Sequence, residues 1–250
     1  MPEIAPEVFL SVVIPIYNEA CRIPSTLAQV VAYLESTGKS YEVVVVDDGS
    51  TDRSVELVEK TCREIPTVGM LRHSVNLGKG AAVRTGMLSA RGEYLLFSDA
   101  DLSAPISEEC QLLQPLLSGY DVAIGSRALR PEWIGVHQSH LREFAGKLFN
   151  ASVRRLIGLD FRDTQCGFKA FRRMAARKIF ACQRIWGFGF DVEVLYLAQK
   201  FDFHTLEVPV HWDHSGVSSV HVLRDGLRMC ADVLAIRWND WRGNYVPPSV

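Results

Sequence analysis

Two aspartates, Asp99 and Asp101, stand one residue apart directly after the apolar run 94–97. In a strand the side chains at i and i+2 point to the same face, so both carboxylates emerge together where this run ends. Neighbouring anions repel each other, and a hard cation such as Mg²⁺ or Mn²⁺ relieves that repulsion by binding both. The alternative for an isolated Asp-x-Asp is a turn with hydrated side chains, so the pair needs support from the rest of the chain.

The elements that must position this pair alternate between strand and helix. Short apolar runs rich in β-branched residues predict buried parallel strands at residues 9–16, 41–46, 68–71, 94–97 and 121–124. Helical stretches lie between them at residues 24–35, 52–64, 80–90 and 106–117. This alternation predicts an α/β fold with one open, mostly parallel twisted sheet covered by helices on both faces. Ligands of such sheets bind at the carboxyl ends of the strands.

Length and composition fit one folded domain of this kind. The chain has 250 residues, of which 48% are hydrophobic and 22% charged. It contains no run of about 18 apolar residues, and Glu3 and Glu7 lie where a signal peptide needs basic and apolar residues. We therefore expect no membrane span and no secretion signal. The six cysteines follow no metal-binding spacing, which predicts reduced thiols without a disulfide or a zinc site.

Polar residues follow the first two predicted strands at the same edge as the aspartate pair. The first strand leads into Tyr17-Asn18-Glu19, and the second into the stretch 47–52, which begins Asp47-Asp48-Gly49. The last three residues of that stretch are better explained as caps of the following helix. Asp47 and Asp48 directly follow four valines, so they must lie at or inside the cleft.

The loop 76–82 contains Gly78, Lys79 and Gly80 and precedes a predicted helix. The glycines let backbone amides come close to a ligand, and the helix N-terminus together with the lysine suits a diphosphate. An ordinary turn explains the loop equally well.

Charge is distributed unevenly along the chain. Residues 126–186 contain 13 Lys and Arg against 4 Asp and Glu, a net +9, which leaves −11 for the rest of a chain whose total is −2. This segregation favours an anionic partner for the segment, although a solvated basic face is the alternative.

In this order the motifs resemble the inverting family 2 glycosyltransferases of the GT-A fold. The likeness continues through Gly125-Ser126-Arg127, residues 163–169 (Asp-Thr-Gln-Cys-Gly-Phe-Lys), residues 190–193 (Phe-Asp-Val-Glu) and residues 208–210 (Val-Pro-Val), and it covers about residues 9–238. Within that family the set is most similar to the dolichyl-phosphate β-glucosyltransferases. The resemblance implies a GT-A catalytic domain at 1–212, with a nucleotide-sugar half at 1–125 and an acceptor half at 126–212, followed by a helical tail at 213–250.

The resemblance also implies roles for single residues. The uracil and ribose of a UDP-sugar would be held by Pro15, Tyr17, Asn18, Glu19, Asp47, Asp48 and Gly49. Lys79, with Gly78 and Gly80, would lie near the diphosphate. The motif Asp99-Ala100-Asp101 would hold Mg²⁺ or Mn²⁺ through its two carboxylates, against the diphosphate oxygens. Ser103 stands where the family often has a further ligand.

The implied reaction is transfer of glucose from UDP-glucose to a polyprenyl phosphate such as dolichyl or undecaprenyl phosphate, with inversion. The metal ion, held by Asp99 and Asp101, and the ammonium of Lys79 would stabilise charge on the leaving diphosphate. A lipid phosphate, with a second pKa of about 6, is already ionised, so it needs cations more than a base. Arg127, Arg130 and Lys169, with Gln165, are the candidates for binding it. Asp191 would orient the acceptor, or act as base toward a hydroxyl acceptor.

Two segments have a composition suited to a membrane surface. Residues 141–157 form a basic amphipathic pattern, and residues 220–241 carry Trp238 and Trp241. Both segments can instead pack on the domain. We expect a peripheral protein on the cytoplasmic face of the membrane, without nucleic acid as a partner and of undetermined oligomeric state. The alternatives are another donor such as GDP-mannose, a saccharide hydroxyl acceptor, or a nucleotide-sugar binding module without turnover.

Overall fold

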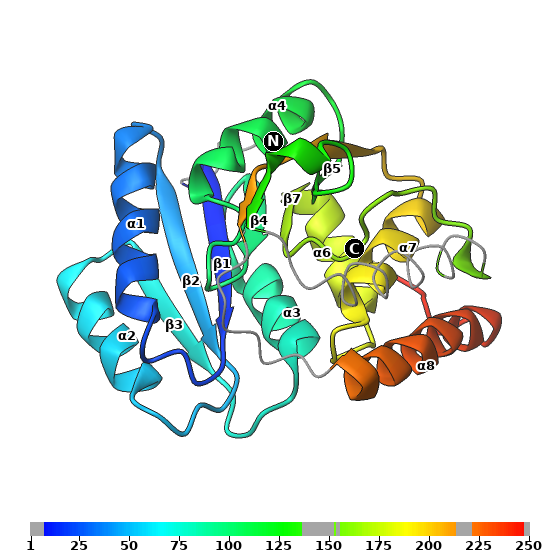
Figure 1. Cartoon of the computed structure of the whole chain (residues 1–250), viewed down its shortest axis with the longest axis horizontal. Coiled ribbons are helices and arrows are strands. Elements are labelled where there is room, and N and C mark those ends of the chain that lie inside the picture. The colour runs from blue at the N-terminus through cyan, green and yellow to red at the C-terminus, as the bar shows by residue number, and fades with distance from the viewer. Residues whose placement is uncertain (1–7, 137–152, 154–155, 214–221, 248–250) are drawn as a thin grey trace, which may run out of the picture.

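The structure is a computed structural model that describes residues 8–136, 153, 156–213 and 222–247, with side chains omitted for 222–227. Within these residues the central sheet has seven strands in the order β3-β2-β1-β4-β7-β5-β8 (Figure 1). In chain order they are β1 (Leu10–Ile16), β2 (Tyr41–Asp47), β3 (Val68–Arg72), β4 (Tyr94–Ser98), β5 (Val122–Ser126), β7 (Phe168–Arg172) and β8 (Thr205–Pro209). Strand β7 runs antiparallel to both neighbours, and the other pairs are parallel.

Helices cover both faces of this sheet. One face is covered by α1 (Ile23–Ser36), α2 (Ser54–Glu64) and α4 (Glu109–Leu117), and the other by α3 (Lys79–Ser89), α6 (Arg173–Cys182), α7 (Phe190–Lys200) and α8 (Val222–Trp241). Two short helices, η1 (Ile106–Glu108) and η2 (Pro131–Trp133), and a small parallel pair, β6 (Ile134–Val136) with β9 (Trp212–Asp213), complete the described elements.

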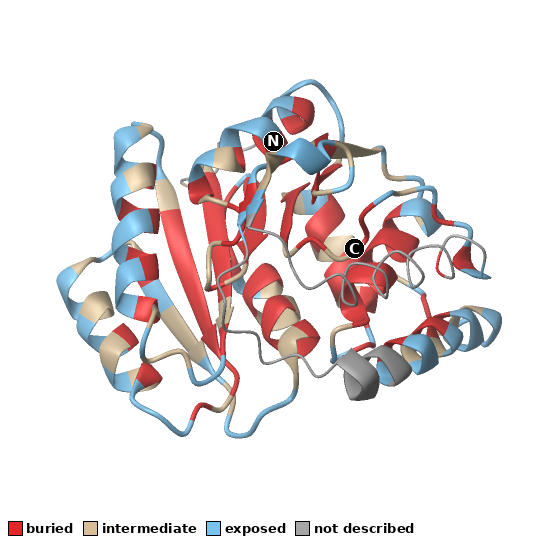
Figure 2. Cartoon of the chain, viewed as in Figure 1, coloured by how far each residue is buried: buried red, intermediate tan, exposed pale blue. Residues whose placement is uncertain are grey.

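The strands are buried on both sides, which is why they appear in the sequence as continuous apolar runs. In β1 the side chain of Val13 packs into the core under α3, whereas Val12 and Ile14 pack into the core under α1. Figure 2 shows the central strands buried along most of their length, while the outer helices are buried mainly on one side. Alternate residues of a strand thus supply two separate cores.

The predicted α/β fold class is confirmed, and the five predicted strands and four predicted helices are all present. Strands β7 and β8 were missing from the prediction. Each is five residues long and carries a charged residue, Lys169 or Glu207, so neither forms an apolar run. The reversed direction of β7 is the main consequence, because Phe168 pairs with Ser98 and the segment before β7 therefore lies beside the end of β4.

Part of the positive charge of segment 126–186 serves the fold itself. Arg172 pairs with Tyr94, at the amino end of β4, and so lies at the edge opposite the aspartate pair. The guanidinium of Arg172 donates to the carbonyl of Leu116, and that of Arg177 donates to the carbonyl of Ala90. These arginines satisfy carbonyl groups at the C-terminal ends of helices α4 and α3. The anionic partner inferred from net charge is therefore supported by fewer cations than the count suggests.

Two further expectations can be set beside the structure. Most of the predicted amphipathic helix at 141–157 lies outside the described residues, but Val153 and Ile157 are buried in the core and Leu156 is half-exposed. Among the residues that the structure describes, no helix is both long and apolar enough to cross a membrane.

Candidate active site

Asn18 connects the ends of β1 and β2. It adopts a left-handed backbone conformation (φ 55°), which asparagine tolerates. Its side-chain oxygen accepts the N–H groups of Thr51 at 2.8 Å and Asp52 at 3.3 Å, and its own N–H donates to Ser50 Oγ at 2.8 Å. Asp52 in turn accepts the N–H of Ser54, the first residue of α2, at 2.9 Å. The capping interpretation of Asp52 thus matches the structure, and Asn18 holds the loop in place.

Asp47 and Asp48 are both buried at the end of β2. Asp48 accepts the N–H groups of Leu77 at 3.0 Å and Gly78 at 2.8 Å, and its carboxylate contacts His73 Nδ1 at 2.7 Å. It therefore fixes the loop that precedes α3. A Cβ at Gly49 would lie 2.6 Å from the carbonyl carbon of Val75, so only glycine fits there. Nucleotide contacts for Pro15, Tyr17, Glu19 and these residues stay predictions.

The glycines around Lys79 lie against another segment of the chain. A Cβ at Gly78 would lie 2.4 Å from the carbonyl oxygen of Trp186, and one at Gly80 would lie 2.7 Å from that of Ile185. The N–H groups of Gly80 and Ala81 donate to the Trp186 oxygen at 2.7 and 3.3 Å. The glycines thus admit another segment of the chain, and in this structure these two amides are not available to a diphosphate.

Lys79 itself reaches the aspartate pair, and its Nζ lies 2.6 Å from Asp99 Oδ1. Burial alone would lower the pKa of Lys79, but the carboxylates of Asp99 and Asp191 outweigh it and raise the pKa. The lysine is therefore charged at neutral pH. Burial raises the pKa of Asp99, and the ammonium of Lys79 opposes this. The ammonium of Lys79 and the carboxylates of Asp99 and Asp191 thus lie close together at the end of β4.

The end of β4 is shaped around the two carboxylates. The N–H of Asp99 donates to the carbonyl of Gly167 at 3.1 Å, and a Cβ at Gly167 would overlap the Asp99 carboxylate at 2.1 Å. Asp101 Oδ1 accepts the N–H of Ser103 at 3.0 Å, and Thr26 Oγ1 donates to the carbonyl of Ala100 at 2.6 Å. Gly167 is thus required by the packing of a predicted metal ligand.

Asp99 and Asp101 can hold a divalent cation only if a bound substrate and water supply its other ligands. Among the described residues no group of three or more His, Cys, Asp or Glu side chains is arranged to hold a metal ion. Mg²⁺ is commonly bound by one or two carboxylates, with substrate phosphates and water completing its shell. The two carboxylates of Asp99 and Asp101 match that pattern, so binding should depend on a diphosphate.

The predicted acceptor-binding cations are already paired. Lys169 is fully buried, and its Nζ lies 2.5 Å from Asp191 Oδ1 and 2.7 Å from the Cys166 carbonyl. Arg127 makes a bidentate contact with buried Asp163 at 2.6 and 2.8 Å. The structure therefore gives both cations internal partners, and neither is a free phosphate ligand here.

The two remaining acceptor candidates lie nearer the surface. Arg130 is exposed and contacts Glu132 at 3.2 Å. Gln165 Nε2 lies 3.6 Å from Met229 Sδ on α8. This last contact places the C-terminal helix beside the predicted acceptor region.

The Arg127–Asp163 pair should govern stability in acid. Burial alone would raise the pKa of Asp163, but the guanidinium of Arg127 outweighs it and lowers the pKa from 3.8 to about 2. Because the folded-state pKa is depressed, this stabilisation is present above about pH 4 and is lost as the pH falls toward 2, by about 2 kcal/mol. Asp163→Asn should lower the free energy of unfolding at pH 7 by about 3 kcal/mol and flatten its decline in acid.

Urea unfolding between pH 2 and 7 measures both effects. Glu132→Gln, which breaks the exposed pair with Arg130, is the matched control and should change little. An unchanged acid decline in Asp163→Asn would contradict the assignment.

Sequence reasoning assigned no role to several residues that shape this site. Asp163 and Gly167 lie in the motif quoted for the family, but their partners Arg127 and Asp99 are distant in sequence, so the spacing gave no clue. His73, which contacts Asp48, follows β3 and carries no motif at all. The one signal in the sequence was its position directly after a predicted strand.

Comparisons with known proteins agree on one family. Residues 11–180 match the model of Glycosyl transferase family 2. Curated relatives include the dolichyl-phosphate beta-glucosyltransferases of Dictyostelium discoideum (35% identity, 92% of this chain and 74% of the relative), Saccharomyces cerevisiae (37%, 92% and 75%) and Homo sapiens (36%, 91% and 74%).

Among solved structures, glucosyl-3-phosphoglycerate synthase from Mycobacterium tuberculosis in complex with Mn²⁺, UDP and glucosyl-3-phosphoglycerate superposes with a TM-score of 0.69. Its identity is 17%, over 92% of this chain and 80% of that one. The same enzyme with Mn²⁺, UDP-glucose and phosphoglyceric acid gives 0.65 at 18% identity, over 92% and 80%. At such identities the likeness concerns the fold.

Proposed function

Because this chain belongs to glycosyl transferase family 2, we propose that it transfers glucose, with inversion, from UDP-glucose to a polyprenyl phosphate and depends on Mg²⁺ or Mn²⁺. The observation that carries the proposal is the meeting of Lys79, Asp99 and Asp101 at the carboxyl end of β4. The names of the relatives support the sugar and the acceptor, and the bound UDP and Mn²⁺ of the solved neighbours support the donor and the metal.

At the donor end, the chain must stabilise charge that develops on the diphosphate as the bond to the anomeric carbon breaks. A cation held by Asp99 and Asp101 would supply Lewis-acid stabilisation of those oxygens. The ammonium of Lys79 lies 2.6 Å from Asp99, so it would stand beside the same oxygens and add a second positive charge. Asp48 positions this lysine, because it holds the backbone of Leu77 and Gly78.

At the acceptor end, the buried contact between Lys169 and Asp191 favours an acceptor that is already ionised. One oxygen of Asp191 is engaged by the Lys169 ammonium at 2.5 Å, so this carboxylate is suited to orienting an acceptor. A phosphate acceptor needs no proton removed, whereas a hydroxyl does. The pairing is the reason for preferring a lipid phosphate over a saccharide hydroxyl.

The direct experiment incubates purified protein with Mn²⁺, radiolabelled UDP-hexoses and a polyprenyl phosphate, and extracts labelled lipid. We expect labelled glycolipid from UDP-glucose and much less from GDP-mannose. Failure to label lipid from any UDP-hexose would end the proposal. Slow hydrolysis of UDP-glucose alone would still exclude a binding module without turnover.

Asp191→Asn distinguishes the two acceptor classes. With a lipid phosphate we expect kcat/KM to fall by about tenfold, because an orienting contact is lost, whereas loss of a true base costs about 1000-fold or more. The acid limb of the pH–rate profile should not move, since it follows ionisation of the acceptor. Asp202→Asn, an exposed aspartate just beyond α7, is the matched control. A loss of the larger size would favour a hydroxyl acceptor.

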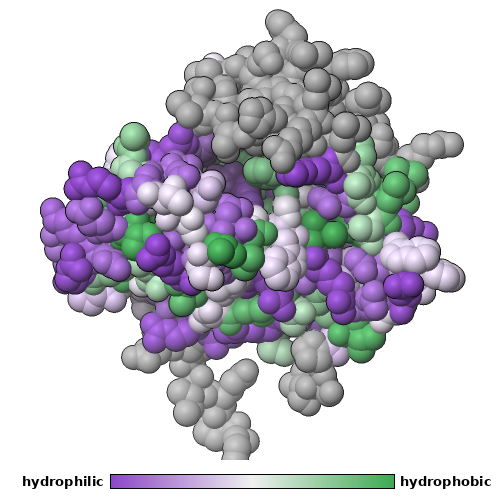
Figure 3. Space-filling model, turned by 90° about the horizontal axis from the view of Figure 1, so that it is seen from below, coloured by the Kyte–Doolittle hydropathy of each residue, from purple (hydrophilic) through white to green (hydrophobic). Residues whose placement is uncertain are grey.

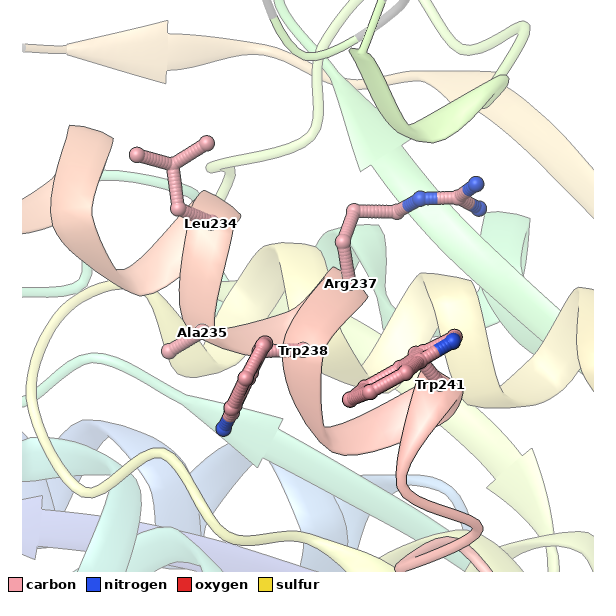
Figure 4. A pocket seen from close by; sticks show the side chains of 5 residues that line it. All are labelled: Leu234, Ala235, Arg237, Trp238 and Trp241. Carbon is pink, nitrogen blue, oxygen red and sulfur yellow. The ribbon is translucent and has the colours of Figure 1, made fainter.

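The exposed side of α8 supports contact with a membrane surface. Leu234, Trp238 and Trp241 are 62%, 53% and 76% exposed, although their neighbours Val233 and Ile236 are buried. Figure 4 shows these side chains and Arg237 projecting from successive turns of the helix, where they line a shallow groove. Tryptophan and arginine together suit the headgroup layer of an anionic bilayer.

The position of α8 fits a lipid acceptor. In Figure 1 the helix lies along the same edge at which β1 and β2 end. Figure 3, viewed from that edge, shows apolar side chains interrupting a polar surface in several places. An enzyme that uses a lipid phosphate must present its site at headgroup level, and α8, the helix with the exposed tryptophans, lies along the edge at which these strands end. A peripheral location at the cytoplasmic face of a membrane is part of the proposal.

The double variant Trp238→Ser/Trp241→Ser tests this surface. We expect binding to vesicles that contain anionic phospholipid to fall by about tenfold or more, because two interfacial aromatic anchors are lost. Vesicle co-sedimentation at low and moderate salt measures it, and turnover of a short, water-soluble polyprenyl phosphate should persist. Leu117→Ser, another exposed apolar residue, at the end of α4, is the control. Equal binding of all three proteins would exclude α8 as the contact.

A further inference from the structure

The residues that directly follow Lys79 are held by the segment 183–187, named here the clamp loop. The carbonyl of Trp186 accepts the N–H groups of Gly80 and Ala81 at the start of α3. The side chain of Gln183 donates to the carbonyl of Gly80 at 2.8 Å and to that of Ile185 at 2.9 Å. No side chain caps α3, so the clamp loop supplies the contacts that fix its first turn.

The clamp loop is itself fixed by Glu193, in the first turn of α7. Its carboxylate accepts the N–H groups of Arg184 at 3.0 Å and Ile185 at 2.8 Å. The side chain is fully buried, and burial raises its pKa, although these hydrogen bonds oppose the shift. A buried acid is costly unless it is hydrogen-bonded, and here the bonds go to the clamp loop.

A residue from the far end of the chain completes the arrangement. The hydroxyl of Tyr245, which is 3% exposed, donates to Glu193 Oε1 at 2.7 Å. Next to it, the guanidinium of Arg184 donates to the carbonyl of Asn244 at 3.0 Å. The segment after α8 is therefore hydrogen-bonded both to the clamp loop and to the residue that fixes it.

We propose that Glu193, held by Tyr245, is a positioning residue for the leaving group of the donor. Neither side chain contacts Lys79; they act through the clamp loop, which sets where α3 starts and hence where the Lys79 ammonium meets the diphosphate. This inference rests on the proposed function for its ligand, but the mechanical link is a property of the chain alone. The C-terminal segment is then part of the donor site, and its removal loosens the lysine.

Tyr245→Phe tests the link, because it removes one hydroxyl and keeps the buried ring beside Tyr196. We expect affinity for UDP with Mn²⁺ to fall and the donor KM to rise, each by about tenfold, the size of one lost hydrogen bond to a charged group. The acceptor KM should not change. Glu193→Gln, which keeps the shape and replaces an acceptor by a donor, should have a larger effect in the same direction.

Tyr196→Phe is the matched control, since this tyrosine of α7 is also buried but its hydroxyl pairs with Asp240 instead of Glu193. Amide hydrogen exchange of residues 78–82, measured without any nucleotide, should accelerate in Tyr245→Phe and not in Tyr196→Phe. If exchange and UDP affinity are the same in both variants, the inference is overturned. If exchange accelerates but wild-type protein binds no UDP, the link stands and the proposed donor is wrong.

Discussion

Asp101→Asn is expected to lower kcat/KM for glucosyl transfer by about 1000-fold. It removes one of the two carboxylates that would hold the metal ion against the leaving diphosphate. Asp101 is the residue replaced here because a change of Asp99 would also remove the 2.6 Å contact with the Lys79 ammonium. Raising the Mn²⁺ concentration should restore part of the lost activity, since an amide oxygen is a weaker ligand for the same ion. The assay is lipid labelling across a Mn²⁺ titration.

Glu59→Gln is the control for this change, because it removes one negative charge from the exposed side of α2, away from the strand ends. Its activity should equal that of the unchanged protein at every Mn²⁺ concentration. Activity of Asp101→Asn within tenfold of the unchanged protein would contradict a role in metal binding.

Lys79→Met should produce two effects of opposite sign. The turnover number is expected to fall by about 100-fold, because a preorganised positive charge next to the leaving group is lost. Affinity for Mn²⁺ should rise, since the ammonium that lies 2.6 Å from Asp99 no longer competes with the metal for that carboxylate. Steady-state kinetics gives the first quantity and calorimetry with Mn²⁺ gives the second.

Lys60→Met, which replaces an exposed lysine on α2, should change neither quantity. A fall in both turnover and Mn²⁺ affinity on replacing Lys79 would mean that the lysine supports the metal site instead of competing for it. Unchanged turnover would remove Lys79 from the chemistry.

The part of the fold that precedes β5 was predictable because its signals are local. Each buried parallel strand is a continuous apolar run, and the polar residues that follow β1, β2 and β4 are read directly from where each run stops. Parallel strands bring such ends to one edge, so the neighbourhood of Asn18, Asp48 and Asp99 followed from the pattern. Their detailed contacts, such as Asp48 with Leu77 and Gly78, depend on loop conformations that a pattern does not specify.

The part of the fold that follows β5 was less predictable because its paired residues are distant in sequence. Lys169 is predicted from the sequence to bind the acceptor phosphate, and in the structure it lies in an antiparallel strand and is paired with Asp191, 22 residues away. Arg127 pairs with Asp163, which is 36 residues away in the sequence. Net charge along a segment does not reveal which charges are neutralised by such pairs, so it does not identify which cations of the basic segment are available to a phosphate.

The glycines beside Lys79 illustrate the same limit. Their sequence pattern indicates close approach, and the structure has close approach, but the approaching group is the carbonyl of Trp186 and not a diphosphate. A glycine-rich loop specifies the space and not its occupant, because backbone amides bind carbonyl oxygens and phosphates in the same way.

Calorimetric titration of Mn²⁺ into protein saturated with UDP tests most directly the claim that Asp99 and Asp101 hold a dication beneath the diphosphate. Uptake of one ion per chain is predicted when UDP is present, with much weaker uptake in its absence, because two carboxylates leave most of the shell to phosphate oxygens and water. In the double variant Asp99→Asn/Asp101→Asn the heat should disappear. No Mn²⁺ uptake at saturating UDP, or undiminished uptake by the double variant, would contradict the account.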